Sequence, residues 1–253
     1  MKGKIAIITG ASSGIGFATA KKFSEQGIKV VAVGRGEKEL ERLRQECAST
    51  GDNIKIHLAD VCEGKQMDRL VADVIAQFGR LDILVNCAGV IQNGTIHSTS
   101  MDDFDRMLDL NLRSVFSLMQ KCVPHLEASK GNVVNVSSVA GPRAFPNLLA
   151  YCVSKAAVDQ LTRCAALDLA PKGVRVNAVN PGVVVTNLHK RGGMSDERYT
   201  EFLEHSKSTH PLGRAGEAHE VADLICFLAS DTAGWITGVT YEIDGGRALT
   251  CAR

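Results

Sequence analysis

The sequence has few aromatic residues, almost no net charge and no apolar run long enough to cross a bilayer. Phe, Tyr and Trp make up 5% of its 253 residues, and 29 basic side chains are balanced by 28 acidic ones, for a net charge of +1. Binding of nucleic acid needs clustered positive charge and often stacking rings, so this composition argues against a nucleic-acid partner. The absence of a long apolar run excludes a transmembrane helix, and we expect no membrane partner.

Cysteine and histidine motifs for disulfides or metals are also missing. The eight cysteines include no Cys-x-x-Cys pair, and the seven histidines show no His-Glu-x-x-His spacing, so we predict no metal site. Met1-Lys2-Gly3 leads directly into an apolar run, so we expect no secretory leader, a cytoplasmic location and free thiols. Four cysteines fall in apolar runs, which is typical of buried thiols: Cys87, Cys122, Cys164 and Cys226.

Short apolar runs alternate with helix-like segments along the whole chain, without a linker or a repeat. This alternation predicts an α/β fold: a single Rossmann-type, doubly wound parallel sheet of about seven strands with helices on both faces, forming one domain over residues 1–253. The predicted strands are near 4–9, 28–33, 54–59, 81–85, 131–136, 174–179 and 238–243. The predicted helices include 37–48, 63–78, 99–127, 150–170 and 217–229.

One stretch, residues 187–216, interrupts this alternation after Thr186. It contains Gly192-Gly193, two short polar helical patches and Pro211. A long excursion beside the ligand edge of a sheet is typical of a lid, so we predict a substrate lid at about 187–216. The alternative is a mobile surface insertion.

Tyr151 and Lys155 lie four positions apart in a predicted helix, so their side chains share one face. An ammonium beside a phenol stabilises the phenolate, which would lower the pKa of the tyrosine from its ordinary value of about 10. A tyrosine tuned in this way can act as a general acid and base near neutral pH. The alternative for this pair, taken alone, is a half-buried tyrosine beside a surface lysine with no catalytic role.

A glycine-rich loop, Thr9–Gly16, follows the first predicted strand and begins a helix. Glycines permit a tight turn and the close approach of a pyrophosphate, and the N-terminus of a helix favours phosphate. The alternative is a glycine turn without a ligand. The position of this loop between a strand and a helix favours a dinucleotide site. The predicted cofactor contacts here are Gly10, Ser12, Ser13, Gly14, Ile15 and Gly16.

Short polar motifs follow the later predicted strands. Ligands of open parallel sheets bind beyond the carboxyl ends of the strands, so these positions are candidates for the same site. A serine there can be only a turn former, and Asn111, inside the predicted helix 99–127, can be only a tolerated polar residue. The motifs are Asn86-Cys87-Ala88-Gly89, Ser137-Ser138 and Asn180-Pro181-Gly182-Val183-Val184-Val185-Thr186.

In their order and spacing these motifs resemble the short-chain dehydrogenase/reductase family, in its shorter, single-domain branch. The resemblance covers residues 3–246 and rests on the glycine loop, Asn-Cys-Ala-Gly, Asn111, Ser138, Tyr151-x-x-x-Lys155 and Pro181-Gly182. At Cys87 the chain departs from the family, which usually has a second asparagine there. The resemblance implies an NAD(P)-dependent oxidoreductase that transfers a hydride between the cofactor and a ketone or secondary alcohol.

The resemblance also implies a role for each catalytic residue. Tyr151 exchanges a proton with the substrate oxygen, Ser138 donates a hydrogen bond to that oxygen, and Lys155 lowers the tyrosine pKa and holds the nicotinamide ribose. Asn111 interrupts its helix and fixes a water that links Lys155 to solvent. The expected catalytic residues are Asn111, Ser138, Tyr151 and Lys155.

Further cofactor contacts are implied by the same resemblance. Asp60 and Val61 resemble the adenine contact of the family, and Thr186 is expected to bond the nicotinamide amide. Tyr151 and Lys155 are expected to contact the cofactor as well. The remaining expected contacts are Asn86, Ala88, Gly89, Pro181, Gly182 and Val184.

The residues after the second predicted strand decide between NADP(H) and NAD(H). An acidic residue there would bond the ribose 2′-hydroxyl and repel a 2′-phosphate, but positions 34 and 35 are Gly and Arg. The guanidinium of Arg35 suits a phosphate, so the sequence favours NADP(H), with NAD(H) as the alternative. Ser13 argues the other way, because many NADP-preferring members have a basic residue at that position. Arg35 could also pair simply with Glu37 or Glu39.

Other functions stay open at this point. A cofactor-binding regulator without turnover usually lacks part of the catalytic set, which is complete here, and nucleotide-sugar epimerases are longer beyond the Tyr-x-x-x-Lys motif. An NAD-linked alcohol dehydrogenase of the same family is a further alternative. The resemblance implies a homotetramer built through helices near 103–127 and 150–170 and through Val239–Asp244.

The sequence does not identify the substrate. Steroids, 3-oxoacyl thioesters, sugars and dicarbonyls all fit, and the physiological direction is open. Arg143 or His189 could meet an acidic group. The expected apolar wall of the pocket consists of Val90, Ile91, Val139, Phe145, Leu148 and Leu149.

Overall fold

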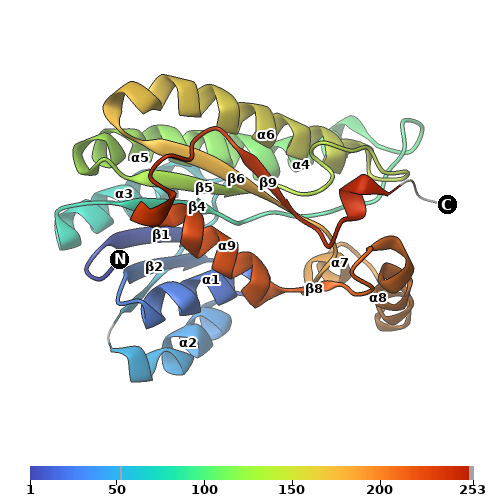
Figure 1. Cartoon of the computed structure of the whole chain (residues 1–253), viewed down its shortest axis with the longest axis horizontal. Helices are drawn as coiled ribbons and strands as arrows, with labels where there is room; N and C mark the ends of the chain where they lie inside the picture. Colours follow the sequence, from blue (N-terminus) through green and yellow to red (C-terminus); the bar gives the residue numbers. More distant parts are fainter. Residues whose placement is uncertain (52, 251–253) are drawn as a thin grey trace.

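The computed structural model describes residues 1–51 and 53–250, which build one seven-stranded parallel sheet (Figure 1). The strand order β3-β2-β1-β4-β5-β6-β9 reverses direction at β1 and β4, as in a doubly wound fold. The predicted fold class is confirmed. The strands of the sheet are β1 (Ile5–Thr9), β2 (Lys29–Gly34), β3 (Ile54–Leu58), β4 (Ile83–Asn86), β5 (Asn132–Val136), β6 (Arg175–Pro181) and β9 (Thr240–Ile243).

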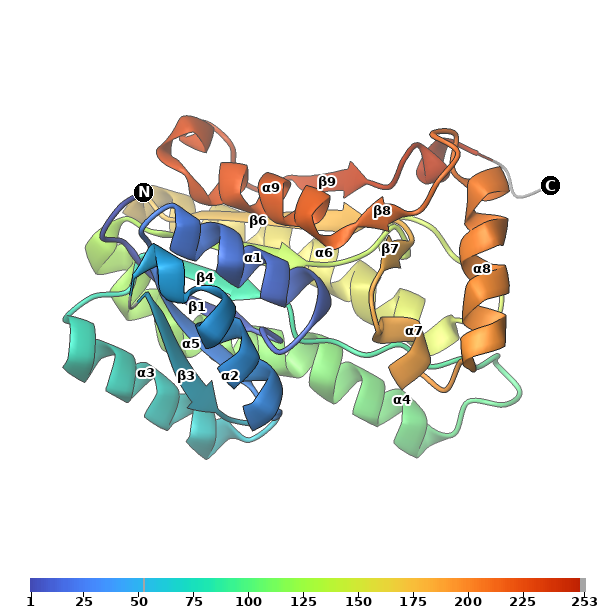
Figure 2. The ribbon, with the colours of Figure 1, turned by 90° about the horizontal axis from the view of Figure 1, so that it is seen from below.

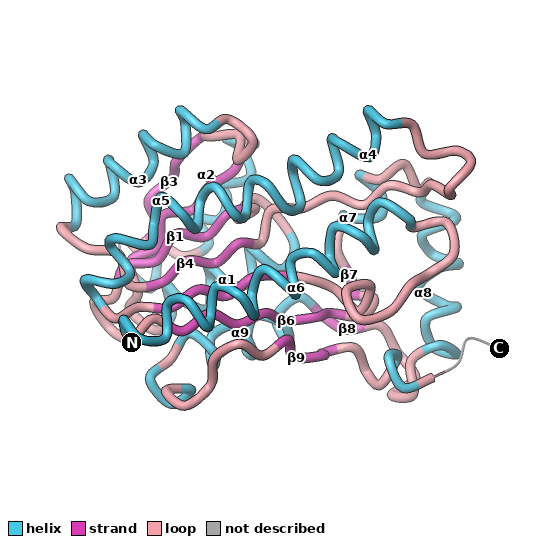
Figure 3. Tube along the Cα trace, turned by 90° about the horizontal axis from the view of Figure 1, so that it is seen from above, coloured by secondary structure: helices cyan, strands magenta, loops and turns pink. Residues whose placement is uncertain are grey.

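Helices cover both faces of the sheet, as Figures 2 and 3 show from opposite sides. One face carries α1 (Gly14–Glu25), α2 (Glu37–Glu46) and α9 (Ala218–Ala229). The other carries α3 (Gly64–Phe78), α5 (Ser114–Ser129) and α6 (Leu149–Leu169), while α4 (Met101–Leu108) prolongs the line of α5.

Two apolar cores result from the alternation of side chains along the strands. In β1, Ala6 and Ile8 point to the core that contains Phe23 of α1. Ile7 points to the opposite core, which contains Leu118 of α5. Each fully buried aliphatic side chain contributes about 1.5–3 kcal/mol to folding. The two cores therefore fix the sheet between its helix layers, and with it the loops at the carboxyl ends of the strands.

The predicted helix 99–127 is not continuous. A π-helical turn, Asp109–Arg113, separates α4 from α5, with the buried Asn111 at its centre. Such turns insert an extra residue and re-aim a side chain, so the interruption expected from the resemblance is confirmed. The apolar pattern of this region continues across the turn, which is why periodicity alone predicted one helix.

Residues 187–216 lie beyond the carboxyl ends of the strands (Figure 2). They contain α7 (Leu188–Arg191) and α8 (Asp196–Thr209), which match the two predicted helical patches. A short parallel pair, β7 (Val184–Val185) and β8 (Gly216–Glu217), joins the two ends of this segment. Among the described residues, no helix has the length and apolar character needed to span a membrane.

The cysteines follow the prediction with one exception. Cys122 and Cys226 are buried and Cys87 is half-buried, but Cys164 is exposed. It lies on the outward side of α6, where an apolar run in the sequence turns away from the core. The prediction that Cys164 is buried is wrong.

Candidate active site

A cavity of about 970 Å³ lies at the carboxyl edge of the sheet. Loops that follow β1, β2, β3, β4, β5 and β6 line it, together with α7, α8 and the start of α6. Most predicted site residues line this cavity: Gly10, Ser12, Ser13, Gly14, Ile15, Arg35, Asp60, Val61, Ala88, Gly89, Ser138, Tyr151, Lys155, Pro181, Gly182, Val184 and Thr186.

Three predicted site residues lie behind the cavity wall. Gly16 packs against the loop itself, because a Cβ there would overlap the carbonyl oxygen of Gly10. Asn86 is buried and its Nδ2 donates to Oδ1 of Asn135, 2.9 Å away, so it links β4 to β5. Asn111 is the third. These three residues lie outside the cavity lining, and a direct contact of Gly16 or Asn86 with the cofactor stays a prediction.

The glycine loop makes close contacts that exclude side chains. Gly10 has a φ of +66°, and a Cβ there would lie 2.9 Å from Cα of Ala88. Gly14 has a φ of +56°, and its Cβ would lie 3.0 Å from Cγ2 of Thr186. The loop therefore lies tightly between the ends of β1 and β4, as a backbone cradle for a pyrophosphate requires.

The N-terminus of α1 faces this cradle. Ser13 precedes the helix but makes no side-chain capping bond to it, so the first N–H groups of α1 are not used by that side chain. Its hydroxyl instead accepts a hydrogen bond from Nη1 of Arg191, 2.9 Å away. Arg191 ends α7, and sequence reasoning missed it, although the basic run His189-Lys190-Arg191 was a visible signal.

Asn111 fixes the loop that follows β4. Its Oδ1 accepts from the backbone N–H of Val90 at 2.9 Å, and its Nδ2 donates to the carbonyl of Val90 at 3.0 Å. The same amide donates to Oγ of Ser154 at 3.1 Å. A Cβ at Gly89 would lie 3.4 Å from Oδ1 of Asn111 and 3.6 Å from Nζ of Lys155, so Gly89 separates the two side chains.

Tyr151, Ser138 and Lys155 lie together in the wall beyond β5. All three are buried, and Nζ of Lys155 lies 5.8 Å from the centre of the Tyr151 ring. Lys155 donates to the carbonyl of Val136 at 2.9 Å. The hydroxyl of Ser138 accepts from the N–H of Ala140 at 3.1 Å, so its own proton can be donated to a neighbouring oxygen such as that of Tyr151.

Burial dominates the pKa values of this pair. Desolvation raises the pKa of Tyr151 to about 12, and a hydrogen bond from Ser138 opposes the rise. Desolvation also lowers the pKa of Lys155 to about 8, against the attraction of Cys87 and Asp159. The prediction that Lys155 lowers the tyrosine pKa is therefore wrong for this structure, because its ammonium is bound to Val136 and the phenol has lost its water.

Comparisons with known proteins agree with this geometry. Residues 10–248 match the family model described as "Enoyl-(Acyl carrier protein) reductase". A 3-oxoacyl-[acyl-carrier-protein] reductase, FabG, from Thermotoga maritima is 36% identical over 250 residues, covering 98% of this chain and 99% of the relative.

Solved structures agree as well. A short-chain dehydrogenase/reductase of unknown function from Caenorhabditis elegans, solved with cofactor, has a TM-score of 0.93 and 39% identity, over 99% of this chain and 97% of that one. An aldohexose dehydrogenase from Thermoplasma acidophilum has a TM-score of 0.89 and 32% identity, over 100% and 96% of the two chains.

The chain belongs to the short-chain dehydrogenase/reductase family. It is an NAD(P)-dependent enzyme that acts on CH–OH/C=O groups.

At the nucleotide edge of this dehydrogenase/reductase, Arg35 follows β2. Its Nη1 lies 3.3 Å from Oδ2 of Asp60, and its side chain is 71% exposed. The partner is thus Asp60, and neither Glu37 nor Glu39. An exposed pair of this kind is worth at most about 1 kcal/mol, so a phosphate could compete for the guanidinium.

At the opposite edge, one expectation about substrate binding is corrected. Arg143 does not face an acidic substrate group, because its Nη1 donates to the carbonyls of Arg247, Ala248 and Thr250 at 3.1, 2.6 and 2.5 Å. His189 does line the cavity, with its ring 4.5 Å from that of Phe202. Arg247 also lines it, and sequence reasoning missed that residue. Of the predicted apolar wall, five residues line the cavity: Val90, Ile91, Val139, Phe145 and Leu148.

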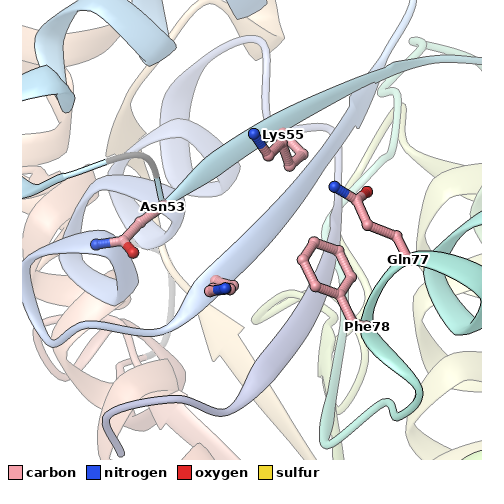
Figure 4. Close-up of a pocket in the computed structure, with 5 residues that line it drawn as sticks. Asn53, Lys55, Gln77 and Phe78 are labelled. Atoms are coloured by element: carbon pink, nitrogen blue, oxygen red, sulfur yellow. The ribbon is translucent and has the colours of Figure 1, made fainter.

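A second, smaller cavity of about 270 Å³ lies away from this site. It is bounded by Lys29, at the start of β2, and by the labelled residues of Figure 4, where Gln77 and Phe78 extend from the end of α3 toward Lys55. The described residues that line it include two lysines and no acidic side chain. Within residues 1–51 and 53–250 no three His, Cys, Asp or Glu side chains form a metal-binding group.

Proposed function

We propose that this enzyme transfers a hydride between NADP(H) and a ketone or secondary alcohol, with Tyr151 as general acid and base. One observation carries the proposal: Tyr151, Ser138 and Lys155 are buried side by side in the wall of a cavity whose other walls include the glycine cradle. Proton chemistry and dinucleotide binding thus share one space, which hydride transfer to a carbonyl requires.

The cofactor site fits the residues present. A Cβ at Gly10 would overlap the backbone of Ala88, and one at Gly14 would press on Thr186, so the tight loop needs both glycines; the N-terminus of α1 offers N–H groups to phosphate. When bound, the nicotinamide supplies or accepts the hydride. We propose that Pro181, Gly182, Val184 and Thr186 bound its ring and amide, and that Asp60 and Val61 contact the adenine.

The polar residues act on the substrate oxygen. Ser138, which accepts from Ala140 and has a proton to donate, gives a hydrogen bond to that oxygen, where negative charge grows during reduction. With a pKa of about 12, Tyr151 holds its proton at neutral pH and can give it to the much more basic alkoxide. Lys155, with a pKa of about 8, can then supply a proton to Tyr151 after the tyrosine has given its own to the alkoxide.

Two arginines support NADP(H) over NAD(H). Arg35 lies at the cavity edge after β2, and the residue before it is Gly34, so no carboxylate repels a 2′-phosphate there. Arg191 donates to Ser13 of the glycine loop, so the lid supplies a cation where the loop itself has none. The long side chain of Arg191 could bind either the pyrophosphate or the 2′-phosphate of the cofactor.

We further propose that residues 187–216 act as the substrate lid of one domain spanning 1–253. The bond between Arg191 and Ser13 already ties α7 to the nucleotide loop. For assembly we propose a homotetramer, supported by exposed apolar side chains on α5, α6 and β9: Phe116, Val153, Leu167 and Tyr241. Sedimentation that finds only monomer at micromolar concentration would argue against it.

The experiment is NADPH oxidation against a panel of ketones, diketones, quinones and a 3-oxoacyl thioester, the substrate class named for the Thermotoga maritima relative. We expect turnover with at least one carbonyl and none with Tyr151→Phe. A cofactor-binding regulator would bind NADPH in a calorimeter yet oxidise it with no member of the panel, which would contradict the proposal.

A further inference from the structure

Arg247 lies at the end of the cavity opposite Arg35. It follows β9, an outer strand of the sheet, while Arg35 follows β2, and the strands β1, β4, β5 and β6 lie between them. Both guanidinium-bearing residues line the same cavity. Because Ser138 follows β5, the reacting oxygen lies between the two arginines, and Arg247 belongs to the substrate side.

The guanidinium of Arg247 is not held in an ion pair by any described residue. Within residues 1–51 and 53–250 it forms no ion pair; its Nη1 donates to Oγ1 of Thr209 at 3.0 Å, and the guanidinium lies 5.1 Å from the centre of the Phe145 ring. The carboxylate of Asp244, three residues earlier, accepts instead from the backbone N–H groups of Gly246 and Ala248 at 2.9 and 2.6 Å. A half-buried guanidinium has five N–H donors, so most of them stay available to a ligand.

The turn that carries Arg247 is fixed from two sides. Asp244 holds its N–H groups, and Arg143 holds its carbonyls through the three bonds described above. Arg143 thereby adds a second positive charge close to the first, and burial together with Arg143 lowers the pKa of Arg247 against the attraction of Asp244. The structure thus stabilises a fixed, partly desolvated positive charge at the cavity wall.

The surroundings favour one anion at this end. Burial and the charge of Arg247 both lower the pKa of His189, so its ring is neutral near pH 7 and can still donate a hydrogen bond. Among the described residues that line the cavity, Asp60 is the one carboxylate, and it lies at the nucleotide end beside Arg35. Asp244, the carboxylate that acts on Arg247, lies outside this lining and is bound to backbone N–H groups, so an anionic group beside Arg247 would meet no carboxylate of the described cavity wall.

We propose that Arg247 binds the carboxylate of an oxo acid or hydroxy acid whose carbonyl or hydroxyl carbon reacts at Ser138 and Tyr151. The planar fork of arginine matches a carboxylate, and the rings of Phe145 and Phe202 bound the chain between the two groups. This inference rests on the proposed carbonyl chemistry and names the class of substrate that the site takes.

The test compares oxo acids with their methyl esters, which differ only in the charge at the far end. We would measure kcat/KM with NADPH for 3-oxobutanoate, 4-oxopentanoate and 5-oxohexanoate and for each ester. The wild type should prefer at least one acid over its ester by about tenfold or more, the effect of one charge-assisted hydrogen bond. In Arg247→Met this ratio should fall to about one, and Arg247→Lys should restore part of it.

A control separates charge from general damage. Arg69→Met removes a surface guanidinium on α3 that pairs with Asp73 and does not line the cavity as described, so its acid-to-ester ratio should equal that of the wild type. A wild-type ratio near one for every length, or a ratio unchanged in Arg247→Met, would overturn the inference while leaving the proposed function intact.

Failure of the carbonyl chemistry can be told apart from failure of the anion site. If no ketone in either series is reduced, the proposed function fails. The anion site is then judged by calorimetric binding of 5-oxohexanoate to the enzyme with NADP. Binding that weakens about tenfold in Arg247→Met but not in Arg69→Met supports the site, and equal binding by all three proteins overturns it.

Discussion

The two ends of the cavity each carry an arginine, but they handle its charge differently. At the β2 end, Arg35 is 71% exposed and lies 3.3 Å from Asp60, so water and a carboxylate both compensate it. At the β9 end, Arg247 is half-buried, lies against Phe145 and has no acidic partner among the described residues. The open end can accept or lose a phosphate at small cost, whereas the enclosed end stabilises a bound anion more strongly.

Between the two ends lie the proposed catalytic residues, where burial is greatest. Tyr151, Lys155 and Ser138 are all buried, and desolvation shifts the pKa values of the first two in opposite directions. The cavity thus changes from open to enclosed along the sheet edge. Variants at the centre should therefore have the largest effects, and variants at the exposed nucleotide end the smallest.

The centre is tested by Tyr151→Phe, which removes the proton donor and little volume. We expect turnover to fall by about 10³-fold or more, at the upper part of the range for general acid catalysis. NADPH affinity should change less than about threefold. Steady-state rates and calorimetric dissociation constants measure the two quantities, and turnover within tenfold of the wild type would remove Tyr151 from its role.

Close packing at the nucleotide loop is tested by Gly16→Ala. The new Cβ would overlap the carbonyl oxygen of Gly10, so we expect a loss of about 3 kcal/mol in the free energy of unfolding and at least about tenfold weaker NADPH binding. Gly64→Ala is the matched control, because no atom lies within 4 Å of its Cβ position at the start of α3. There, urea titration should show unchanged or slightly higher stability, and equal losses at both sites would refute the packing argument.

The buried centre also predicts how stability depends on pH. Lys155 has a pKa of about 8 in the fold and about 10.5 when unfolded. Between these values the unfolded chain holds a proton that the folded chain has released, so this residue makes stability rise with pH by up to about 1.4 kcal/mol per unit.

Below pH 8 both states hold the proton and the contribution to the slope vanishes. We would compare urea unfolding of the wild type and Lys155→Met from pH 7 to pH 9, below the pKa of about 10 at which Tyr151 titrates in the unfolded chain. As pH rises above 8, the free energy of unfolding of the wild type should increase relative to that of Lys155→Met. A difference that stays constant across this range would show that Lys155 is not desolvated as described.

The open end is tested by Arg35→Asp. Losing one charge-assisted bond to a 2′-phosphate should weaken NADP binding by about tenfold, while NAD binding holds or improves because Asp can accept from the ribose hydroxyls. Dissociation constants at two salt concentrations should show a smaller loss at high salt, since the site is exposed. Tighter binding of NAD than NADP by the wild type would make Arg35 only a surface cation.

The elements that sequence reasoning found are those with a local signal. The strands could be predicted because each is a short β-branched run, and the glycine loop because its place between strand and helix is visible in the chain. The same holds for Tyr151 and Lys155, which one helical turn brings together. That the glycine loop, Tyr151 and Lys155 lie in one cavity could be predicted from the rule that ligands bind at the carboxyl edge of a parallel sheet.

The features it missed depend on tertiary structure. Arg191 reaches Ser13 across 178 positions, and Arg247 is presented by a turn that Arg143 holds from 104 positions away. The pKa of Tyr151 was predicted in the wrong direction because burial, which no local pattern gives, outweighs a neighbouring ammonium. Asn86 lies behind the cavity wall because side-chain direction at the end of β4 is set by the sheet, and Gly16 lies there because α1 packs against the carbonyl of Gly10.

The central claim is that a hydride passes directly between the nicotinamide and a carbonyl carbon held at Tyr151, in the middle of this cavity. NADPH carrying deuterium on C4 of the nicotinamide, incubated with the best ketone of the panel, tests it most directly by mass spectrometry of the alcohol. The account predicts deuterium on the carbinol carbon from one of the two C4 positions only, and none with Tyr151→Phe. Alcohol formed without deuterium from either labelled form of NADPH would contradict it.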